Sequence, residues 1–147
     1  MKLTMILCDA AQVAEGKLYI LGGGWNIIGP SPAPSALGLL IEVPWDRANA
    51  PFTLRLALHD QDGAPVIQPG PVGPQSVQLE ATMEAGRPPG LTDGSPVQIP
   101  LAISVPPLAL AAGTRYRWEV AMAGEPERED WNISFQTRPA TPPLTPP

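Results

Sequence analysis

Apolar side chains recur at every second position in the stretch Phe52-Thr53-Leu54-Arg55-Leu56-Ala57-Leu58-His59. Successive side chains of a β-strand point to opposite faces of its sheet, so Leu54, Leu56 and Leu58 share one face. The polar side chains between them lie on the other face. This period of two predicts a strand that is buried on one side and in contact with water on the other.

The same alternation recurs in four later segments, and together the five segments indicate an all-β protein. Less regular strands are expected earlier in the chain. The later segments are 77–84, 97–105, 115–122 and 131–136, and the earlier ones are about 2–8, 17–21, 25–28 and 37–43. The first two early strands are apolar on both faces, which predicts a central position or a covering partner. Pro100 places its strand at a sheet edge or bulge, because proline cannot donate to the ladder.

These elements predict an immunoglobulin-like β-sandwich of about nine short, mainly antiparallel strands, with turn signals roughly every 8 to 12 residues. Tyr116 favours a sandwich over a barrel. It follows a turn of small residues and enters the penultimate strand, where its hydroxyl is expected to bond back to the corner backbone. At most one short helical turn is expected, at Asp9–Gly16, with Asp9 as its cap and Gln12 completing a capping box.

The chain of 147 residues fits one domain, which we place at residues 1–137. The 21 prolines separate short apolar segments and gather at the C-terminus. Residues 138–147 are expected to form a disordered proline-rich tail, because their prolines leave only polyproline II or coil. The tail has the spacing of polyproline ligands, although a tail without a partner is the simpler interpretation.

Net charge argues against several partners and compartments. The chain carries a charge of −5 and only nine Lys and Arg residues, so no nucleic-acid partner and no membrane partner are expected. A single cysteine permits no internal disulfide, which suits a reducing compartment. The apolar run that ends at Asp9 is too short for a signal peptide, and no segment is long enough to span a membrane. We therefore expect a cytoplasmic protein.

The most distinctive local feature is Gly22-Gly23-Gly24-Trp25. Consecutive glycine amides can form an anion-binding nest, and a neighbouring tryptophan can stack on a ring. No phosphate-binding pattern accompanies them, so a sharp strand crossing with a packed tryptophan is the favoured interpretation. The candidate ligand-binding residues are Gly22, Gly23, Gly24 and Trp25, with Trp45 or the loop at 86–94 as a wall.

No catalytic or metal-binding set is predicted. Cys8 precedes the expected helical turn, where a thiolate would be stabilised, but a nucleophile needs a base. His59 is the only histidine, and nothing in the sequence brings it to Cys8. Asp60 and Asp62 resemble the start of a calcium loop, but such a loop needs more oxygen ligands, so a tight turn is favoured. We expect no cofactor and no enzyme.

The N-terminal residues resemble those of a known family. The opening Met1-Lys2-Leu3-Thr4-Met5-Ile6-Leu7-Cys8-Asp9-Ala10-Ala11-Gln12 and the later Gly22–Trp25 signature are similar to a bacterial, largely actinobacterial, domain-of-unknown-function family. The similarity covers about residues 1–137 and leaves out the tail. It implies a bacterial cytoplasmic setting and a single compact domain. Because the family has no assigned activity, the resemblance carries no functional residues over to this chain.

Two functional hypotheses follow. The first is a non-enzymatic protein-interaction or assembly module whose partner is another protein or a second copy of the chain. It is motivated by the absence of a catalytic set and by the N-terminal strand that is apolar on both faces. The alternative is a small-ligand-binding domain with its site near the Gly22–Trp25 loop, which would require an apolar pocket with a few polar groups.

Overall fold

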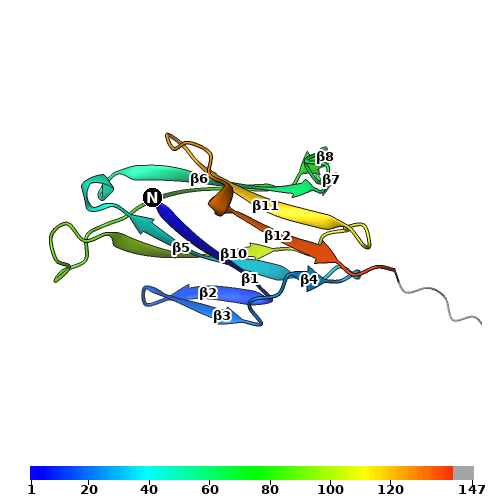
Figure 1. Ribbon diagram of the computed structural model, residues 1–147, viewed down its shortest axis with the longest axis horizontal. Coiled ribbons are helices and arrows are strands. Elements are labelled where there is room, and N and C mark those ends of the chain that lie inside the picture. Colours follow the sequence, from blue (N-terminus) through cyan, green and yellow to red (C-terminus); the bar gives the residue numbers. More distant parts are fainter. Residues whose placement is uncertain (141–147) are drawn as a thin grey trace, which may run out of the picture.

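The computed structural model describes residues 1–140, and its regular secondary structure is almost entirely β-strand (Figure 1). Residues 141–147 of the predicted tail lie outside the described residues. The strands are β1 (Lys2–Cys8), β2 (Ala10–Ala14), β3 (Lys17–Leu21), β4 (Ile27–Ile28), β5 (Ser35–Val43), β6 (Pro51–Asp60), β7 (Ile67–Gly70), β8 (Gly73–Ser76), β9 (Gln78–Glu84), β10 (Val97–Val105), β11 (Arg115–Met122) and β12 (Asn132–Thr137). Each strand predicted from the sequence has a counterpart, and β2, β7 and β8 are additional.

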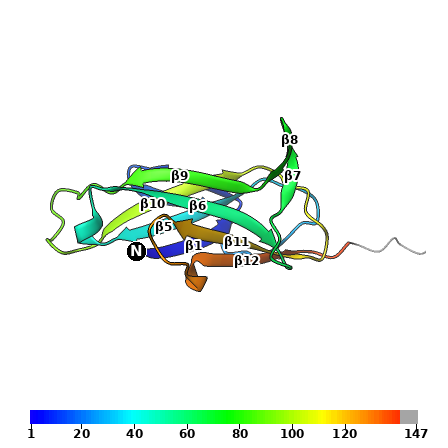
Figure 2. The same cartoon turned by 90° about the horizontal axis from the view of Figure 1, so that it is seen from above.

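Two packed sheets form a β-sandwich, as predicted (Figure 2). One sheet has the order β1-β5-β10, and the other has the order β4-β12-β11-β6-β9. All neighbours within these sheets are antiparallel except β4, which pairs parallel to the end of β12. Pro100 lies in β10, an edge strand, which confirms the edge position expected for this proline.

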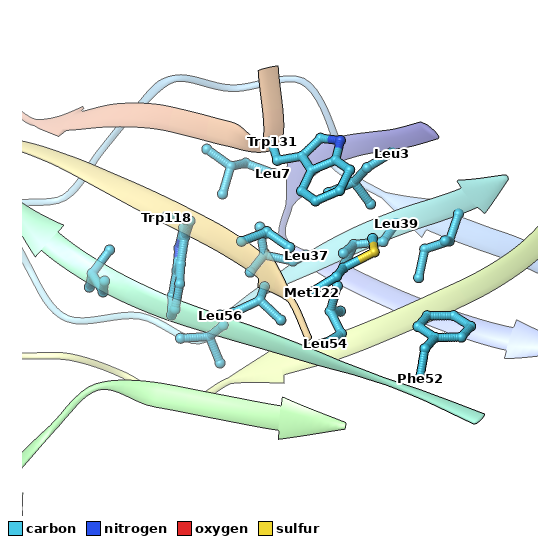
Figure 3. Close-up of a cluster of buried hydrophobic side chains, with 14 of the residues drawn as sticks. Leu3, Leu7, Leu37, Leu39, Phe52, Leu54, Leu56, Trp118, Met122 and Trp131 are labelled. Atoms are coloured by element: carbon cyan, nitrogen blue, oxygen red, sulfur yellow. The ribbon is translucent and has the colours of Figure 1, made fainter. Parts of the chain in front are cut away.

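The core lies between the two sheets and follows the period of two (Figure 3). Leu54, Leu56 and Leu58 of β6 are all buried, which confirms the face predicted from the sequence. They meet side chains of the other sheet and two tryptophans near the C-terminus. These further members include Leu7, Leu37, Leu39, Ile41, Trp118, Met122 and Trp131.

A tyrosine corner fixes the end of the sandwich where β11 begins. The hydroxyl oxygen of Tyr116 accepts a hydrogen bond from the backbone N–H of Ala111 at 2.9 Å, which confirms the predicted contact. Thr137, a buried polar residue, completes the corner. Its Oγ1 accepts a hydrogen bond from the N–H of Thr114 at 3.0 Å and donates one to the carbonyl of Ala111 at 2.6 Å.

Two hairpins, β2–β3 and β7–β8, lie outside the main sheets. The β2–β3 hairpin covers the outer face of the three-stranded sheet, where Gly38 of β5 permits a close approach. A Cβ at Gly38 would stand 3.0 Å from Cδ1 of Ile20 and 3.3 Å from Cδ2 of Leu18. The hairpin thus covers the outer face of β1 at Ile6, which confirms the covering partner expected for this strand, whereas β3 packs on the sheet through Leu18 and Ile20 alone.

The predicted helical turn at Asp9–Gly16 is wrong. These residues form β2 and the turn that joins it to β3, and the two turn residues Glu15 and Gly16 have φ values of 51° and 70°. Positive φ at both central residues defines the two-residue turn that suits the twist of a hairpin. Within residues 1–140, the helical turns are instead two short 3₁₀ segments, Trp45–Arg47 and Glu129–Trp131.

Candidate functional site

The glycines predicted as a ligand site connect β3 to β4 and are held by the end of β1. The N–H of Gly24 donates to the carbonyl of Leu7 at 2.8 Å. In return, the N–H of Asp9 lies 3.1 Å from the carbonyl of Leu21 and 3.2 Å from that of Gly22. These bonds tie the segment to the sandwich. The arrangement agrees with the strand-crossing interpretation.

Trp25 packs at the same end of the sandwich, next to the tyrosine corner. Its ring stands edge-on to Phe135, with centroids 5.9 Å apart and an interplanar angle of 89°. Its indole Nε1 is buried and has no hydrogen-bond partner among the described residues. The cavity that Trp25 lines measures about 30 Å³. A cavity of this size has room for a water molecule but not for a metabolite.

Trp45 begins the 3₁₀ segment Trp45–Arg47, which follows the end of β5. The guanidinium of Arg87 covers its ring at 4.1 Å, and Nη2 of Arg87 donates to the carbonyl of Trp45 at 2.6 Å. Strand β5 runs from the cavity beside Trp25 to the turn before Trp45, and its nine residues span about 30 Å. The structure therefore separates Trp45 and the loop at 86–94 from Gly22–Trp25, and the predicted wall of that site is wrong.

Cys8 and His59 do not meet. Cys8 lies under the β2–β3 hairpin, where its thiol is fully buried and donates to the carbonyl of Ala36 at 3.4 Å. Burial raises the pKa of this thiol above its ordinary value, and the negative charge of Asp9 raises it further. The neutral thiol is a poor nucleophile. His59 faces away from the core on the other sheet, so the two residues cannot act as a nucleophile and base.

The outer face of the five-stranded sheet carries a polar hollow of about 580 Å³. Ala57 of β6 and Ala121 of β11 form its floor, because their short side chains leave space between longer neighbours. The walls come from β6, β11, β12 and the loop before β12. They consist of Arg55, His59, Arg117, Glu119, Glu127, Arg128, Glu129 and Asn132.

Each arginine of this hollow pairs with a carboxylate of the same chain, and His59 contacts one as well. Nδ1 of His59 lies 2.7 Å from Oε2 of Glu119, which also pairs with Arg117. Across the strands, Nη2 of Arg55 lies 3.2 Å from Oε2 of Glu80. The Arg55–Glu80 and His59–Glu119 contacts are cross-strand pairs on a solvated face, whereas Arg117 and Glu119 pair within β11.

Arg128 and Asp130 form the most complete of these pairs. Nε and Nη2 of Arg128 donate to the two carboxylate oxygens of Asp130 at 2.9 and 2.6 Å. These hydrogen bonds hold the pKa of Asp130 below its usual range. Nη1 of Arg128 also donates to the carbonyl of Met1 at 3.0 Å, so the pair ties the loop before β12 to the N-terminus.

The turn after β6 uses its acidic residue for backbone hydrogen bonds. Oδ1 of Asp60 accepts from the N–H groups of Asp62 and Ala64 at 2.9 and 3.0 Å, which supports the tight-turn interpretation over a calcium loop. Within residues 1–140, no three His, Cys, Asp or Glu side chains cluster in a way that could hold a metal ion.

Comparison with known proteins identifies the family but no activity. A family model described as a family of unknown function, DUF6941, matches residues 3–133. The chain belongs to the DUF6941 family. The match begins in β1 and ends in β12, so it spans both sheets of the sandwich. No curated protein and no solved structure matches the chain. In the described part of this DUF6941 domain, no helix has the length and apolar character needed to cross a membrane.

The exposed large hydrophobic side chains of the DUF6941 domain concentrate on its two hairpins. Tyr19 and Leu21 of β3 are 51% and 72% exposed, and Val13 of β2 is 40% exposed. Ile67 of β7 and Val72, in the turn before β8, are 54% and 90% exposed. These five are the exposed large hydrophobics found within residues 1–140. The strand at 17–21, which is apolar on both faces, is the sequence signal for the exposed side chains of the first hairpin. The sandwich covers one face of this strand, and the other face is exposed to solvent.

Proposed function

We propose that this DUF6941 domain is a non-enzymatic protein-interaction module that binds another protein through its two hairpins. The observation that carries the proposal is the placement of all five exposed large hydrophobics of residues 1–140 on β2–β3 and β7–β8. The strands of the two main sheets bury their large apolar side chains, wholly or in part. Within residues 1–140, the exposed large apolar side chains therefore lie on elements outside the two main sheets.

The outward face of β2–β3 supports a docking role. Tyr19 lies opposite Gln12 and Leu21 lies opposite Ala10, so the two exposed apolar side chains neighbour each other on β3 and are bordered by small or polar residues. Burying apolar area contributes roughly 25 cal/mol per Å², and tyrosine is enriched in protein interfaces. A net charge of −5 makes two copies of the chain repel, which favours a different protein as the partner.

The proposal also includes the type of β-sandwich and the cellular location of the protein. The strand orders β1-β5-β10 and β9-β6-β11-β12 correspond to A-B-E and C′-C-F-G of an immunoglobulin-like sandwich, and the tyrosine corner supports this type. Folds of this type serve widely as interaction domains, although that link is one of analogy. We place the protein in the cytoplasm of bacteria, largely actinobacteria, because of its single cysteine and the N-terminal resemblance.

Capture from native cytoplasm with the tagged full-length chain tests the proposal. The double variant Tyr19→Ser/Leu21→Ser removes the apolar face of β3, and Gln12→Ser/Lys17→Ser is a matched control on the same hairpin. We expect the wild type and the control to retain one protein at constant stoichiometry, and the double variant to lose it. Both variants change exposed residues, so their unfolding free energies should stay within about 0.5 kcal/mol of the wild type. Recovery of the bait alone in every case would contradict the proposal.

A further inference from the structure

Strands β9 and β10 form the edges of the two sheets on one side of the sandwich (Figure 2). Side chains that point inward from the central strands are fully buried, as at Leu39 and Leu56. The inward side chains along β9 and in the middle of β10 are only half-buried, whereas Val97 and Val105 at the ends of β10 are buried. The half-buried side chains include Leu79, Ala81 and Met83 of β9 and Ile99, Leu101 and Ile103 of β10. The core is therefore less completely covered along this open side, between the two edges, than at its centre.

The free edge of β9 also offers backbone hydrogen-bonding groups. The N–H of Leu58 donates to the carbonyl of Val77 at 3.0 Å, and the register pairs Leu56 with Leu79. Bonded positions alternate in an antiparallel pair, so Leu79, Ala81 and Met83 point their backbone groups at β6. The backbone groups of Gln78, Glu80, Thr82 and Glu84 then point away from β6, and within residues 1–140 none of them makes a backbone hydrogen bond outside the ladders.

The edge of β10 is less suited to pairing. Pro100 lies in the middle of this strand, opposite Leu40 of β5, and supplies no N–H. A proline on an edge strand interrupts any ladder that another strand would form there. Strand β9 contains no proline from Gln78 to Glu84, so it is the edge at which an additional strand can pair without interruption.

We infer that β9 accepts an extended segment of a partner protein, which adds a sixth strand to the five-stranded sheet. This inference rests on the proposed function and names a second surface for it. Residues of the segment that lie beside Leu79 and Met83 face inward, so alternate positions must be apolar to cover Ile99 and Leu101. The bound segment closes the open side of the core.

The charges on β9 indicate which residues the bound segment should carry on its outward face. The outward side chains of β9 include Glu80 and Glu84. Glu80 is paired with Arg55, whereas Glu84 makes no ion pair within the described residues. Lys or Arg at the alternate positions of the segment would face these carboxylates, and opposite charges on neighbouring strands stabilise pairing. A second copy of β9 would instead bring the same two carboxylates to the edge, which disfavours a homodimer.

Synthetic peptides long enough to span β9 test the inference on the full-length chain. One probe alternates Lys and Val, and its control alternates Glu and Val. Binding is measured by fluorescence anisotropy to the wild type, to Thr82→Pro and to Thr82→Ala. Both variants lose the hydroxyl contact to Thr53 at 3.0 Å, but only proline removes the outward N–H. We expect the Lys–Val probe to bind the wild type and Thr82→Ala equally, and Thr82→Pro roughly tenfold more weakly.

Amide hydrogen exchange of the wild type tests whether the probe pairs with β9, and this test does not depend on how well Thr82→Pro folds. The amides of Glu80 and Thr82 should gain protection when the Lys–Val probe binds. Equal binding to both variants, equal binding of the Glu–Val control, or unchanged amide exchange would overturn the inference. A homodimer that Thr82→Pro disrupts would also overturn the inference, because the strand added to β9 would then come from a second copy of the chain and not from a partner protein. A captured protein lost by Tyr19→Ser/Leu21→Ser but kept by Thr82→Pro would overturn this inference alone and leave the interaction module standing.

Discussion

The hydroxyl of Tyr116 is a single polar atom that holds the turn before β11 to the sandwich. Its ring stacks on Phe135 with centroids 5.7 Å apart, while its oxygen accepts the N–H of Ala111. Tyr116→Phe keeps the ring and leaves that part-buried N–H without its partner. We expect the free energy of unfolding to fall by about 1 kcal/mol, measured by urea denaturation. Tyr19→Phe, on the exposed face of β3, is the control and should change stability by much less. Equal losses in the two variants would show that the corner hydrogen bond contributes nothing specific.

Other residues of the same corner show the limit of prediction from sequence. Tyr116 could be found because a turn of small residues followed by tyrosine has a known geometry. Thr137 could not, because a threonine near a strand end gives no sign that it will be buried and bonded to Ala111 and Thr114. The same limit applies to the candidate site. The sequence predicted the strand crossing at Gly22–Trp25. Whether Trp45 lies near this crossing depends on the course of β5, which separates the two tryptophans, and the sequence does not show that course.

Among the elements, strands with regular alternation were predictable and short hairpins were not. Strands β6, β10 and β11 alternate apolar and polar residues over most of their length, and their bounds were predicted closely. Strand β2 consists largely of alanine, which has low strand propensity, so its sequence favoured a capped helical turn. Strands β7 and β8 each contain a proline and were not among the predicted strands. In both hairpins, turn geometry and packing outweigh the intrinsic preference of the residues.

The attachment of the β2–β3 hairpin to the sheet depends on the absence of a side chain at Gly38. A Cβ there would stand 3.2 Å from Cγ2 of Ile6 and 3.0 Å from Cδ1 of Ile20. Gly38→Val therefore overfills this interface. We expect it to lower the free energy of unfolding by about 2 kcal/mol and to speed amide exchange in β2 and β3. Gly86→Val is the control, because a Cβ at Gly86 meets nothing within 4 Å. If the hairpin exchanges no faster in Gly38→Val, its packing on β5 is looser than these distances imply.

For the molecule as a whole, the sequence predicted which side chains face the core but not which strands are neighbours. Alternation assigns each side chain to a face within its own strand, whereas strand order depends on pairing between distant segments. Strand β1 pairs with β5, and β5 pairs with β10, across long separations in sequence. The open side between β9 and β10 follows from this order and from the unequal size of the two sheets. No local sequence pattern shows how many strands each sheet contains. The sequence therefore could not identify β9 as the exposed edge strand before the topology was known.

The unequal cover of the strands predicts a graded stability across the molecule. Strand β5 pairs on both edges and is covered by the core on one face and by β2–β3 on the other. Its amides should exchange only when the whole domain unfolds. The β7–β8 hairpin projects from the two sheets. Its base is tied to β6 by the hydrogen bond from the N–H of Val66 to the carbonyl of Leu58, and Gln68 makes two hydrogen bonds of 3.2 Å to Ala109. The amides of this hairpin should exchange by local opening, orders of magnitude faster than those of β5. Hydrogen exchange of the full-length chain in increasing urea measures both, and the rate in β5 should rise with urea while that in β7–β8 stays nearly constant. If β7–β8 responded to urea as steeply as β5, its exposed apolar tip would belong to the cooperative core and would be rigid before any partner binds.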